Sequence, residues 1–320
     1  MAARTGKAKI AGVMGWPVAH SLSPILHEFW LKKYNIDGAY IPLAVAPENL
    51  EQALRSLGLM GFRGCNVTVP HKEKAFLLVD RVDEFAASIG AVNTIVVEAD
   101  GTLSGSNTDA YGFMENIRQS APELQVKKAL VIGAGGAARA VVAGLASAGL
   151  KHLQILNRTY EKAFDLSEKL QKIFPNILID IIKWEDELPL PLGEGWGEGS
   201  RQAKKDFVFG GIPHPPLSQG EREFAPDLIV NTTSLGMKGQ PPLELNLQNL
   251  PLNCFVTDIV YNPLETPLLT QAKKAGLPTI DGLGMLLHQA VPGFAAWFGQ
   301  TPEVTPELRE KVLEALQCSS

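Results

Sequence analysis

The sequence predicts an α/β fold with two domains, and three observations support this prediction. At 320 residues the chain is long for a single hydrophobic core. Strand-like and helix-like segments alternate along most of its length, as in layered α/β proteins. One stretch reads as strand, glycine-rich turn and helix, which is typical of a nucleotide-binding βαβ unit.

The first hundred residues show this alternation element by element. The predicted elements are strands at 8–15, 39–45 and 64–70, helices at 23–35, 47–60 and 72–80, and a β-hairpin at 91–109. Pro24 falls in the first turn of the first helix, where the missing backbone N–H is not needed. Asp100-Gly101 supplies the turn of the hairpin.

A second domain is predicted to begin at Asp109. A helix at 110–119 leads into a strand–turn–helix–strand–helix stretch at 127–170, and strand-like runs at 227–234 and 254–261 extend the sheet. Residues 188–224 are rich in Gly, Pro, Glu and Ser without periodicity, so we expect a mobile surface insertion with no catalytic role. Two helical patterns at 282–317 could pack on either domain.

The composition limits the classes of partner. A net charge of −5 and an isoelectric point near 5.8 argue against a nucleic acid or an anionic membrane. The N-terminal segment has no signal-peptide pattern, and no apolar run reaches about 18 residues. The widely spaced Cys65, Cys254 and Cys318 support neither a disulfide framework nor a zinc site. We therefore expect a cytoplasmic protein.

The glycine-rich turn, "VIGAGGAARAV", matches the dinucleotide fingerprint G-x-G-x-x-[GA]. Gly133 permits the tight turn, Gly135 lets the backbone approach a pyrophosphate, and Ala138 permits close packing of helix on strand. The helix N-terminus then offers backbone N–H groups to phosphate. A strand-to-helix turn without a ligand is the alternative, which the surrounding βαβ pattern disfavours.

The end of the second strand in this unit indicates which cofactor is bound. NAD-binding units usually carry Asp or Glu about 20 residues after the glycine turn, but here the strand ends in "NRTYEK". Asn157, Arg158, Thr159 and Lys162 offer hydrogen-bond donors and positive charge that suit a 2′-phosphate. The sequence therefore favours NADP over NAD, with an exposed loop charge as the alternative role of Arg158.

Short polar side chains in the first domain are candidates for a binding pocket. Ser21 and Ser23 in an extended chain would point to the same side, where two hydroxyls could hold one carboxylate. Ser23 directly before Pro24 could instead cap the first helix. Asn66 and Thr68 share one face of the strand at 64–70.

Five further polar residues each have an ordinary structural interpretation when they are considered alone. Lys72, just after a strand end, would by itself most often be a surface charge. Asn93 is unusual in a strand and could belong to a turn or bulge. Asp109 could cap the helix that follows it. Tyr261 could be a surface aromatic before a turn, and Gln289 a solvent-facing helix residue.

Nine segments together resemble the shikimate dehydrogenases, which interconvert 3-dehydroshikimate and shikimate with NADPH. They occur in the order expected of that family from about residue 12 to residue 289. The segments are "GWPVAHSLSPILH", "GFRGCNVTVPHKE", "GAVNTI", "GSNTDAYGF", "VIGAGGAARA", "NRT", "VNTTSLGM", "DIVYNPLETPLL" and "DGLGMLLHQA". Residues 188–224 are not part of the resemblance.

The resemblance implies a role for each candidate residue. Lys72 and Asp109 would form the catalytic pair. The residues around the substrate would be Ser21, Ser23, Thr68, Asn93, Asp109, Tyr261 and Gln289. The cofactor would be NADP, and the residues that bind it would be Glu84, Gly133, Ala134, Gly135, Gly136, Ala137, Asn157, Arg158, Thr159, Lys162, Ile259, Gly282 and Met285.

The resemblance also implies the domain plan and the reaction. Residues 1–108 would form an α/β substrate domain to which the C-terminal helices at 282–320 return, and residues 109–281 a Rossmann-type NADP-binding domain. The reaction would be the NADPH-dependent reduction of 3-dehydroshikimate to shikimate, in the pathway to chorismate and the aromatic amino acids. The alternatives are an NAD-dependent quinate/shikimate dehydrogenase and a non-catalytic cofactor-sensing homologue. We expect a small-molecule partner, no nucleic acid, no membrane, and a monomer or homodimer.

Overall fold

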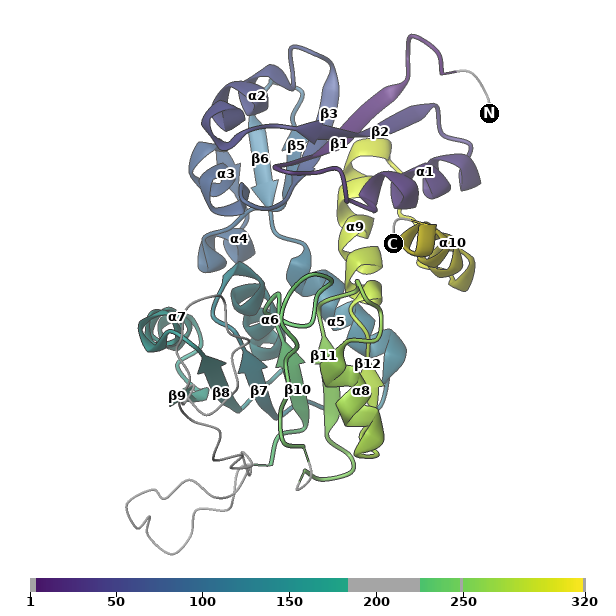
Figure 1. Cartoon of the computed structure of the whole chain (residues 1–320). Coiled ribbons are helices and arrows are strands. Elements are labelled where there is room, and N and C mark those ends of the chain that lie inside the picture. The colour runs from purple at the N-terminus through teal and green to yellow at the C-terminus, as the bar shows by residue number, and fades with distance from the viewer. Residues whose placement is uncertain (1–3, 184–224, 248–249, 319–320) are drawn as a thin grey trace, which may run out of the picture. The chain divides into compact units, whose positions relative to one another are not determined.

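The computed structural model describes residues 4–183, 225–247 and 250–318. The insertion predicted at 188–224 lies outside the described residues. The chain forms two compact units, one of Met1–Asn116 with Gly284–Ser320 and the other of Ile117–Leu283 (Figure 1). The units divide after residue 116, inside helix α5 (Asp109–Ser120), and after residue 283, at the start of helix α9 (Leu283–Phe298). The boundaries expected after residues 108 and 281 therefore lie somewhat before the observed ones.

The first unit is built on a six-stranded mixed sheet in the order β2-β1-β3-β5-β6-β4. Its strands are β1 (Lys9–Gly15), β2 (Gly38–Ala44), β3 (Phe62–Val67), β4 (Arg81–Val82), β5 (Thr94–Val97) and β6 (Leu103–Ser106). Strand β1 pairs in parallel with β2 and β3, and β5 pairs antiparallel with β3 and β6. The predicted hairpin is confirmed as β5 and β6, and Gly101 takes a left-handed φ of 86° in its turn.

The helices of the first unit come from both ends of the chain. They are α1 (Ser23–Lys33), α2 (Leu50–Ser56) after a 3-10 turn at Pro47–Asn49, α3 (Lys72–Leu78), α4 (Glu84–Ile89), the first part of α5, α9 and α10 (Pro306–Cys318). Helix α10 packs on α1, and a Cβ at Gly112 of α5 would meet the backbone nitrogen of Gln289 on α9 at 2.7 Å. The C-terminal helices therefore return to the first unit, as the resemblance implied.

The core of the first unit contains a cluster of aromatic side chains from helices α1 and α9. The rings of Trp30 and Phe294 lie 5.2 Å apart, and both side chains are fully buried. Trp297 Nε1 donates to the carbonyl of Ile95 at 2.9 Å, which ties α9 to strand β5. Gly64 allows this approach, because a Cβ there would collide with both Trp297 and Ile95.

The second unit is an all-parallel six-stranded sheet in the order β12-β11-β10-β7-β8-β9. Its strands are β7 (Lys128–Ile132), β8 (His152–Asn157), β9 (Leu178–Lys183), β10 (Leu228–Asn231), β11 (Phe255–Asp258) and β12 (Thr279–Ile280). The strand order reverses between β7 and β10. In open parallel sheets, ligands bind at the carboxyl ends of the strands beside such a reversal.

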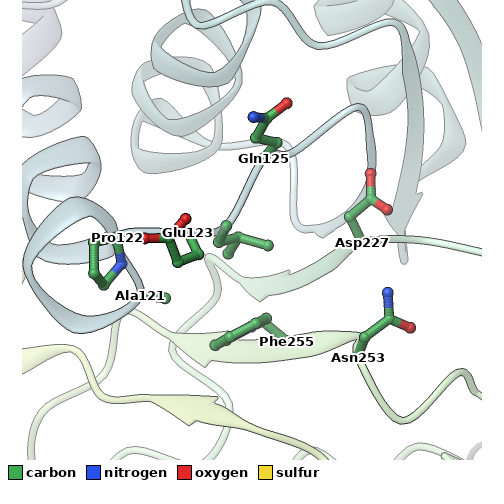
Figure 2. Close-up of a pocket in the computed structure, with 8 residues that line it drawn as sticks. Ala121, Pro122, Glu123, Gln125, Asp227, Asn253 and Phe255 are labelled. Carbon is green, nitrogen blue, oxygen red and sulfur yellow. The ribbon is translucent and has the colours of Figure 1, made fainter.

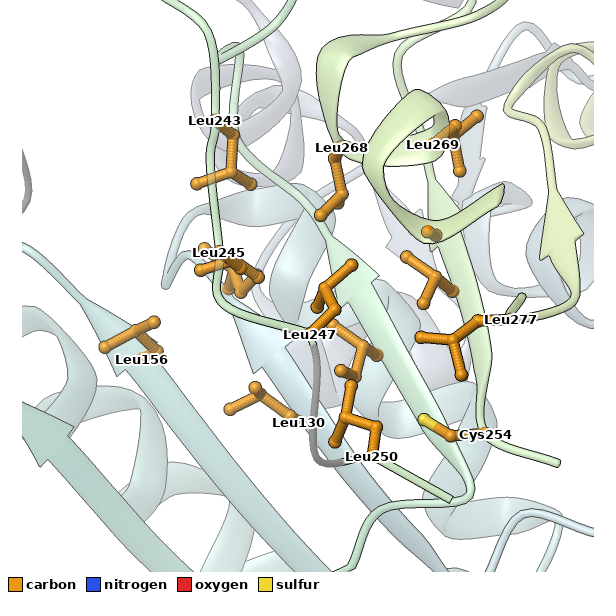
Figure 3. Close-up of a cluster of buried hydrophobic side chains, with 14 residues drawn as sticks. Leu130, Leu156, Leu243, Leu245, Leu247, Leu250, Cys254, Leu268, Leu269 and Leu277 are labelled. Carbon is orange, nitrogen blue, oxygen red and sulfur yellow. The ribbon is translucent and has the colours of Figure 1, made fainter. Parts of the chain in front are cut away.

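Helices α6 (Gly136–Ser147), α7 (Tyr160–Ile173) and α8 (Pro267–Lys274) complete the second unit. Leucines from the strands, from α8 and from the segment before β11 gather into one hydrophobic core (Figure 3). Leu130 of β7 and Leu268 of α8 are fully buried in it. Continuous apolar strands buried on both faces are typical of parallel sheets.

The two-sheet α/β architecture confirms the predicted fold class, but five elements are absent from the prediction: β4, α4, β9, α8 and β12. In α4, Asp83 caps the helix by accepting a hydrogen bond from the backbone nitrogen of Ala86 at 2.6 Å, and Gly90 ends it with a φ of 66°. Both end signals can be recognised in the sequence, but a helix of six residues is too short to show a helical periodicity of apolar residues. Among the described helices, none has the length and apolar character to cross a membrane.

Candidate functional site

Strand β3 and helix α3 of the first unit place Lys72 at a fixed point. The strand ends at Val67, and His71 N donates to the carbonyl of Thr68 at 2.8 Å to turn the chain. His71 is buried, and its Nε2 lies 2.8 Å from the carbonyl of Val45, which pins the turn to the end of β2. Lys72 is therefore the first residue of α3, with a side chain only 29% exposed.

The Lys72 side chain forms an ion pair rather than extending into solvent. Its Nζ donates to Asp109 Oδ2 at 2.6 Å, and the Asp109 side chain is 10% exposed. A charge-assisted hydrogen bond of this length between partly buried groups is a strong one. Asp109 is the first residue of α5; its carboxylate bonds Lys72 and Asn93, and its backbone nitrogen donates to Asn107 Oδ1 at 3.0 Å.

Asn93 holds the second carboxylate oxygen of Asp109. Its Nδ2 donates to Asp109 Oδ1 at 2.8 Å, and its Oδ1 accepts from the backbone nitrogen of Thr108 at 2.9 Å. Asn93 is 2% exposed and lies just before strand β5. The polar contacts that its side-chain amide makes explain why Asn93 occupies a position where an apolar residue would be expected.

Three residues support Asn93, and of these sequence reasoning found Asn66 but missed Tyr40 and Thr94. Asn66, on β3, donates from Nδ2 to Thr94 Oγ1 at 3.0 Å, and Thr94 Oγ1 donates to Asn93 Oδ1 at 2.9 Å. The hydroxyl of Tyr40, on β2, donates to Asn66 Oδ1 at 2.6 Å. The shared face of Asn66 and Thr68 was the available signal, but Tyr40 and Thr94 read as ordinary strand residues.

The two serines differ from expectation in geometry. Leu22 between them has helical dihedrals, with φ −86° and ψ −7°, so the segment is not extended. Ser23 is the first residue of α1 and does not cap it; Ser21 Oγ instead accepts from the backbone nitrogen of Ser23 at a long 3.4 Å. The alternative in which Ser23 caps α1 is therefore wrong. The Ser23 side chain is buried and hydrogen-bonds the Tyr40 hydroxyl.

Thr68 and Gln289 complete the first-unit candidates. Thr68 is half-buried after β3, and its methyl group would meet a Cβ at Gly15 at 2.6 Å, so glycine at that strand end makes room for it. Gln289, on α9, is half-buried; its carbonyl accepts from Thr108 Oγ1 at 2.8 Å, and its Nε2 donates to Leu286 O at 3.1 Å. The alternative of a solvent-facing glutamine is wrong.

In the second unit, the glycine turn lies between β7 and α6 beside the strand-order reversal. Gly133 has φ 110°, and a Cβ there would meet Thr232 Oγ1 of the neighbouring strand end at 2.6 Å. Gly135 and Gly136 have nothing within 4 Å of the Cβ position, which leaves open space over the turn. Ala138, in the first turn of α6, is fully buried, as its role in helix packing requires.

The turn therefore has the shape of a phosphate cradle. Ala134 is buried, and Gly136 and Ala137 begin α6, whose first backbone N–H groups have no partner within the helix. An anion placed over Gly135 would face these donors and the positive end of the helix dipole. The residues present fit a dinucleotide pyrophosphate.

The end of β8 presents the polar run that favoured NADP. Asn157 Nδ2 donates to the carbonyl of Thr159 at 2.7 Å, which shapes the turn into α7. Arg158 and Lys162 are exposed, so both cations are accessible to a ligand. The carboxylate of Glu161, also exposed, belongs to the first turn of α7.

The remaining second-unit candidates lie at the end of β11. Asp258 is buried and accepts hydrogen bonds from Asn231 Nδ2, Val260 N and Thr266 Oγ1; burial raises the pKa of its carboxyl group and these bonds oppose the shift. It thereby fixes the loop that carries Ile259 and Tyr261.

Tyr261 is half-buried, and burial raises the pKa of its phenol. Gly282 packs against this loop, where a Cβ would meet the carbonyl of Ile259 at 2.5 Å. Met285 and Glu84 belong to the first unit: Met285 is buried on α9, and Glu84 is exposed in the first turn of α4.

Two other features stand apart from these sites. A pocket of about 400 Å³ lies at the amino ends of the second-unit strands, where Asp227, Asn253 and Phe255 line it (Figure 2). Asp227 Oδ2 is occupied by the backbone nitrogens of Lys127 and Lys128, both at 2.8 Å. The described residues contain no cluster of His, Cys, Asp or Glu suited to a metal ion.

Comparison with protein-family models gives three matches in chain order. Residues 13–95 match the shikimate dehydrogenase substrate-binding domain, and residues 115–183 match the shikimate/quinate 5-dehydrogenase model. Residues 282–317 match the shikimate 5′-dehydrogenase C-terminal domain.

Individual relatives match over nearly the whole chain. Shikimate dehydrogenase (NADP(+)) of Rhodospirillum rubrum is 51% identical over 97% of this chain and 98% of its own length. The crystal structure of shikimate 5-dehydrogenase from Thermus thermophilus with NADP(H) and shikimate is 32% identical, with a TM-score of 0.73 over 98% of this chain and all of that one. Quinate dehydrogenase from Corynebacterium glutamicum with NAD is 27% identical, with a TM-score of 0.79 over 96% of this chain and 99% of that one.

Proposed function

We infer the function from one premise: the chain belongs to the shikimate dehydrogenase family. The chain is an NADP-dependent shikimate dehydrogenase that reduces 3-dehydroshikimate to shikimate and runs the reverse oxidation. The observation that carries the proposal is the ion pair of Lys72 Nζ and Asp109 Oδ2 at 2.6 Å, held by a buried amide in the unit that matches the substrate-binding model. A proton donor and its positioning carboxylate are what a carbonyl reduction needs besides hydride.

The first unit would bind the substrate through short polar groups. The substrate carries one carboxylate and several hydroxyls, which require hydroxyl and amide partners at close spacing. The residues proposed to surround it are Ser21, Ser23, Thr68, Asn93, Asp109, Tyr261 and Gln289. Ser21 and Ser23 would hold the carboxylate, although they reach it from a helix start and not from an extended segment.

Lys72 would deliver the proton. As hydride reaches the carbonyl carbon, the oxygen becomes an alkoxide, and the ammonium of Lys72 both stabilises this charge and donates the proton that completes the hydroxyl. Asp109 holds the ammonium at a fixed position and can accept a hydrogen bond from a neighbouring substrate hydroxyl. In the oxidation direction the neutral amine of Lys72 takes the proton back.

The second unit would bind the cofactor. Gly133, Gly135 and the start of α6 would hold the pyrophosphate, for which the open space over Gly135 and Gly136 provides room. Arg158 and Lys162 would bind the 2′-phosphate, and Ile259, Gly282 and Met285 would contact the nicotinamide end. NADPH, when bound, supplies the hydride.

The test is oxidation of shikimate by the purified chain, followed through the absorbance of NADPH. We expect turnover with shikimate and NADP+. Initial rates on both substrates with both cofactors separate the alternative of an NAD-dependent quinate/shikimate dehydrogenase, for which the structural similarity to quinate dehydrogenase is the supporting observation. Faster turnover with quinate and NAD would replace the proposal with that alternative.

A non-catalytic homologue is the second alternative. It predicts measurable NADPH binding without turnover of 3-dehydroshikimate, and the presence of both Lys72 and Asp109 in a formed ion pair argues against it. A cytoplasmic location and a monomeric or homodimeric state belong to the same proposal, and size-exclusion chromatography with light scattering would distinguish the two states.

A further inference from the structure

We propose that Tyr40 is a positioning residue for the catalytic pair. Its hydroxyl fixes the side-chain amides that hold Asp109 against Lys72, although Tyr40 itself touches neither residue. This inference rests on the function proposed above, and it extends that function to a residue outside the substrate and cofactor sites.

A buried chain of hydrogen bonds leads from Tyr40 to Asp109. The Tyr40 hydroxyl donates to Asn66 Oδ1 at 2.6 Å, and Asn66 Nδ2 donates to Thr94 Oγ1 at 3.0 Å. Thr94 Oγ1 donates to Asn93 Oδ1 at 2.9 Å, and Asn93 Nδ2 donates to Asp109 Oδ1 at 2.8 Å. Each of these five residues is at most 7% exposed, so water does not compete for the bonds.

Two backbone groups fix the donor-to-acceptor direction of these hydrogen bonds. Asn66 Nδ2 also donates to the carbonyl of Asn93 at 3.1 Å, and a carbonyl can only accept, so Asn66 must present its oxygen to Tyr40. Asn93 Oδ1 accepts from the backbone nitrogen of Thr108, which can only donate, so Asn93 must present its N–H to Asp109. The donors therefore all run from Tyr40 toward the carboxylate.

The Tyr40 ring is held so that its hydroxyl cannot move away. It stacks on the His27 ring of α1 with centroids 3.8 Å apart and planes at 7°, and the Trp297 ring of α9 lies 5.9 Å from it. Neither ring nitrogen of His27 has a hydrogen-bond partner, so His27 acts here as a flat packing surface.

Removing the Tyr40 hydroxyl would leave Asn66 Oδ1 buried without its donor. Loss of one partner from a buried hydrogen bond costs about 1–3 kcal/mol, and the Asn66 amide can relieve this only by rotating away from Thr94. That rotation would loosen Asn93 and hence the carboxylate that positions Lys72. We therefore expect Tyr40→Phe to lower kcat by about tenfold, because each 1.4 kcal/mol of lost transition-state stabilisation corresponds to that factor.

The experiment compares Tyr40→Phe with Tyr34→Phe in shikimate oxidation. Tyr34 lies in the same unit, and its hydroxyl accepts from the backbone nitrogen of Glu303 at 3.0 Å, outside the chain of hydrogen bonds. We expect kcat to fall about tenfold in Tyr40→Phe, with the KM for NADP+ unchanged, and to stay at the wild-type level in Tyr34→Phe. An unchanged kcat in Tyr40→Phe would overturn the inference.

A second comparison separates positioning from general destabilisation. In a Lys72→Ala background, measured in single turnovers at high enzyme concentration, Tyr40→Phe should have no further effect, because the ammonium it positions is gone. A further tenfold loss there would overturn the inference. If Tyr40→Phe does not fold, Thr94→Val replaces it in both experiments, because it removes the hydroxyl that joins Asn66 to Asn93 in the same series of hydrogen bonds. A wild-type chain that does not oxidise shikimate would instead overturn the proposed function, and this inference with it.

Discussion

The buried histidine of helix α1 should make the first unit lose stability as the pH falls. His27 is fully buried among Trp30, Tyr40 and Phe294, and neither of its ring nitrogens has a hydrogen-bond partner. Desolvation by burial lowers its pKa from 6.5 to about 3. The folded chain therefore keeps this imidazole neutral at pH values where the unfolded chain binds a proton.

The size of the effect follows from the two pKa values. Because the folded-state pKa is depressed, the stability contribution is fully present above pH 6.5 and is lost as the pH falls from 6.5 toward 3. Between pH 8 and pH 5 the loss from His27 amounts to about 2 kcal/mol, taking about 1.4 kcal/mol for each pH unit below 6.5.

The assay is urea unfolding at pH 8 and pH 5, with the free energy of unfolding compared between wild type and His27→Phe. Acidic groups contribute to both chains and cancel in the difference, so the variant should lose about 2 kcal/mol less than wild type on acidification. His20→Asn, which removes an exposed histidine of the same unit, is the control for histidine removal as such. Equal losses in wild type and His27→Phe would refute the reasoning.

Three further predictions concern the proposed sites. Gly133→Ala should weaken NADP+ binding by tenfold or more, because φ 110° and the contact with Thr232 force strain of about 1–2 kcal/mol; isothermal titration calorimetry measures it, and unchanged affinity would contradict it. Arg158→Ala should raise the KM for NADP+ by about tenfold and leave that for NAD+ unchanged, because charged hydrogen bonds to the 2′-phosphate contribute about 1.5–3 kcal/mol; equal changes for both cofactors would show that Arg158 does not read this phosphate. Asn93→Ala should lower the free energy of unfolding by about 3 kcal/mol, because its buried partners Thr94 and Thr108 lose their acceptor; chemical denaturation measures it, and a loss below about 1 kcal/mol would contradict it.

Much of the fold could be predicted because the sequence patterns are local. The glycine turn, the hairpin at Asp100-Gly101 and the proline at the start of α1 each act within a few residues, and each has the predicted element. Most of the elements absent from the prediction are short: strand β12 has two residues, too few to repeat a pattern. Helix α8 is different, because it has recognisable end signals, Thr266 as its N-cap and Pro267 in its first turn, which the sequence analysis did not use.

The candidate site could be predicted in its residue types but not in its geometry. A polar side chain at a strand end, such as Asn93, is conspicuous, and so is a lysine that follows a strand within a few residues. Which groups bond one another depends on strands that are distant in the chain, as with Tyr40 and Asn66. The cap considered for Ser23 failed for a local reason: the helical dihedrals of Leu22 place Ser23 inside α1 and give Ser21 the contact with the helix backbone.

The measurement that tests the central claim most directly is the turnover number of Lys72→Ala. Lys74→Ala is the matched control, because Lys74 lies two residues along the same helix, is exposed and bonds only a backbone carbonyl, that of Pro47 at 3.0 Å. In shikimate oxidation we expect kcat to fall at least about 100-fold in Lys72→Ala, with KM for shikimate changed far less, and to stay at the wild-type level in Lys74→Ala. A Lys72→Ala enzyme with near wild-type turnover would contradict the assignment of Lys72 as the proton donor.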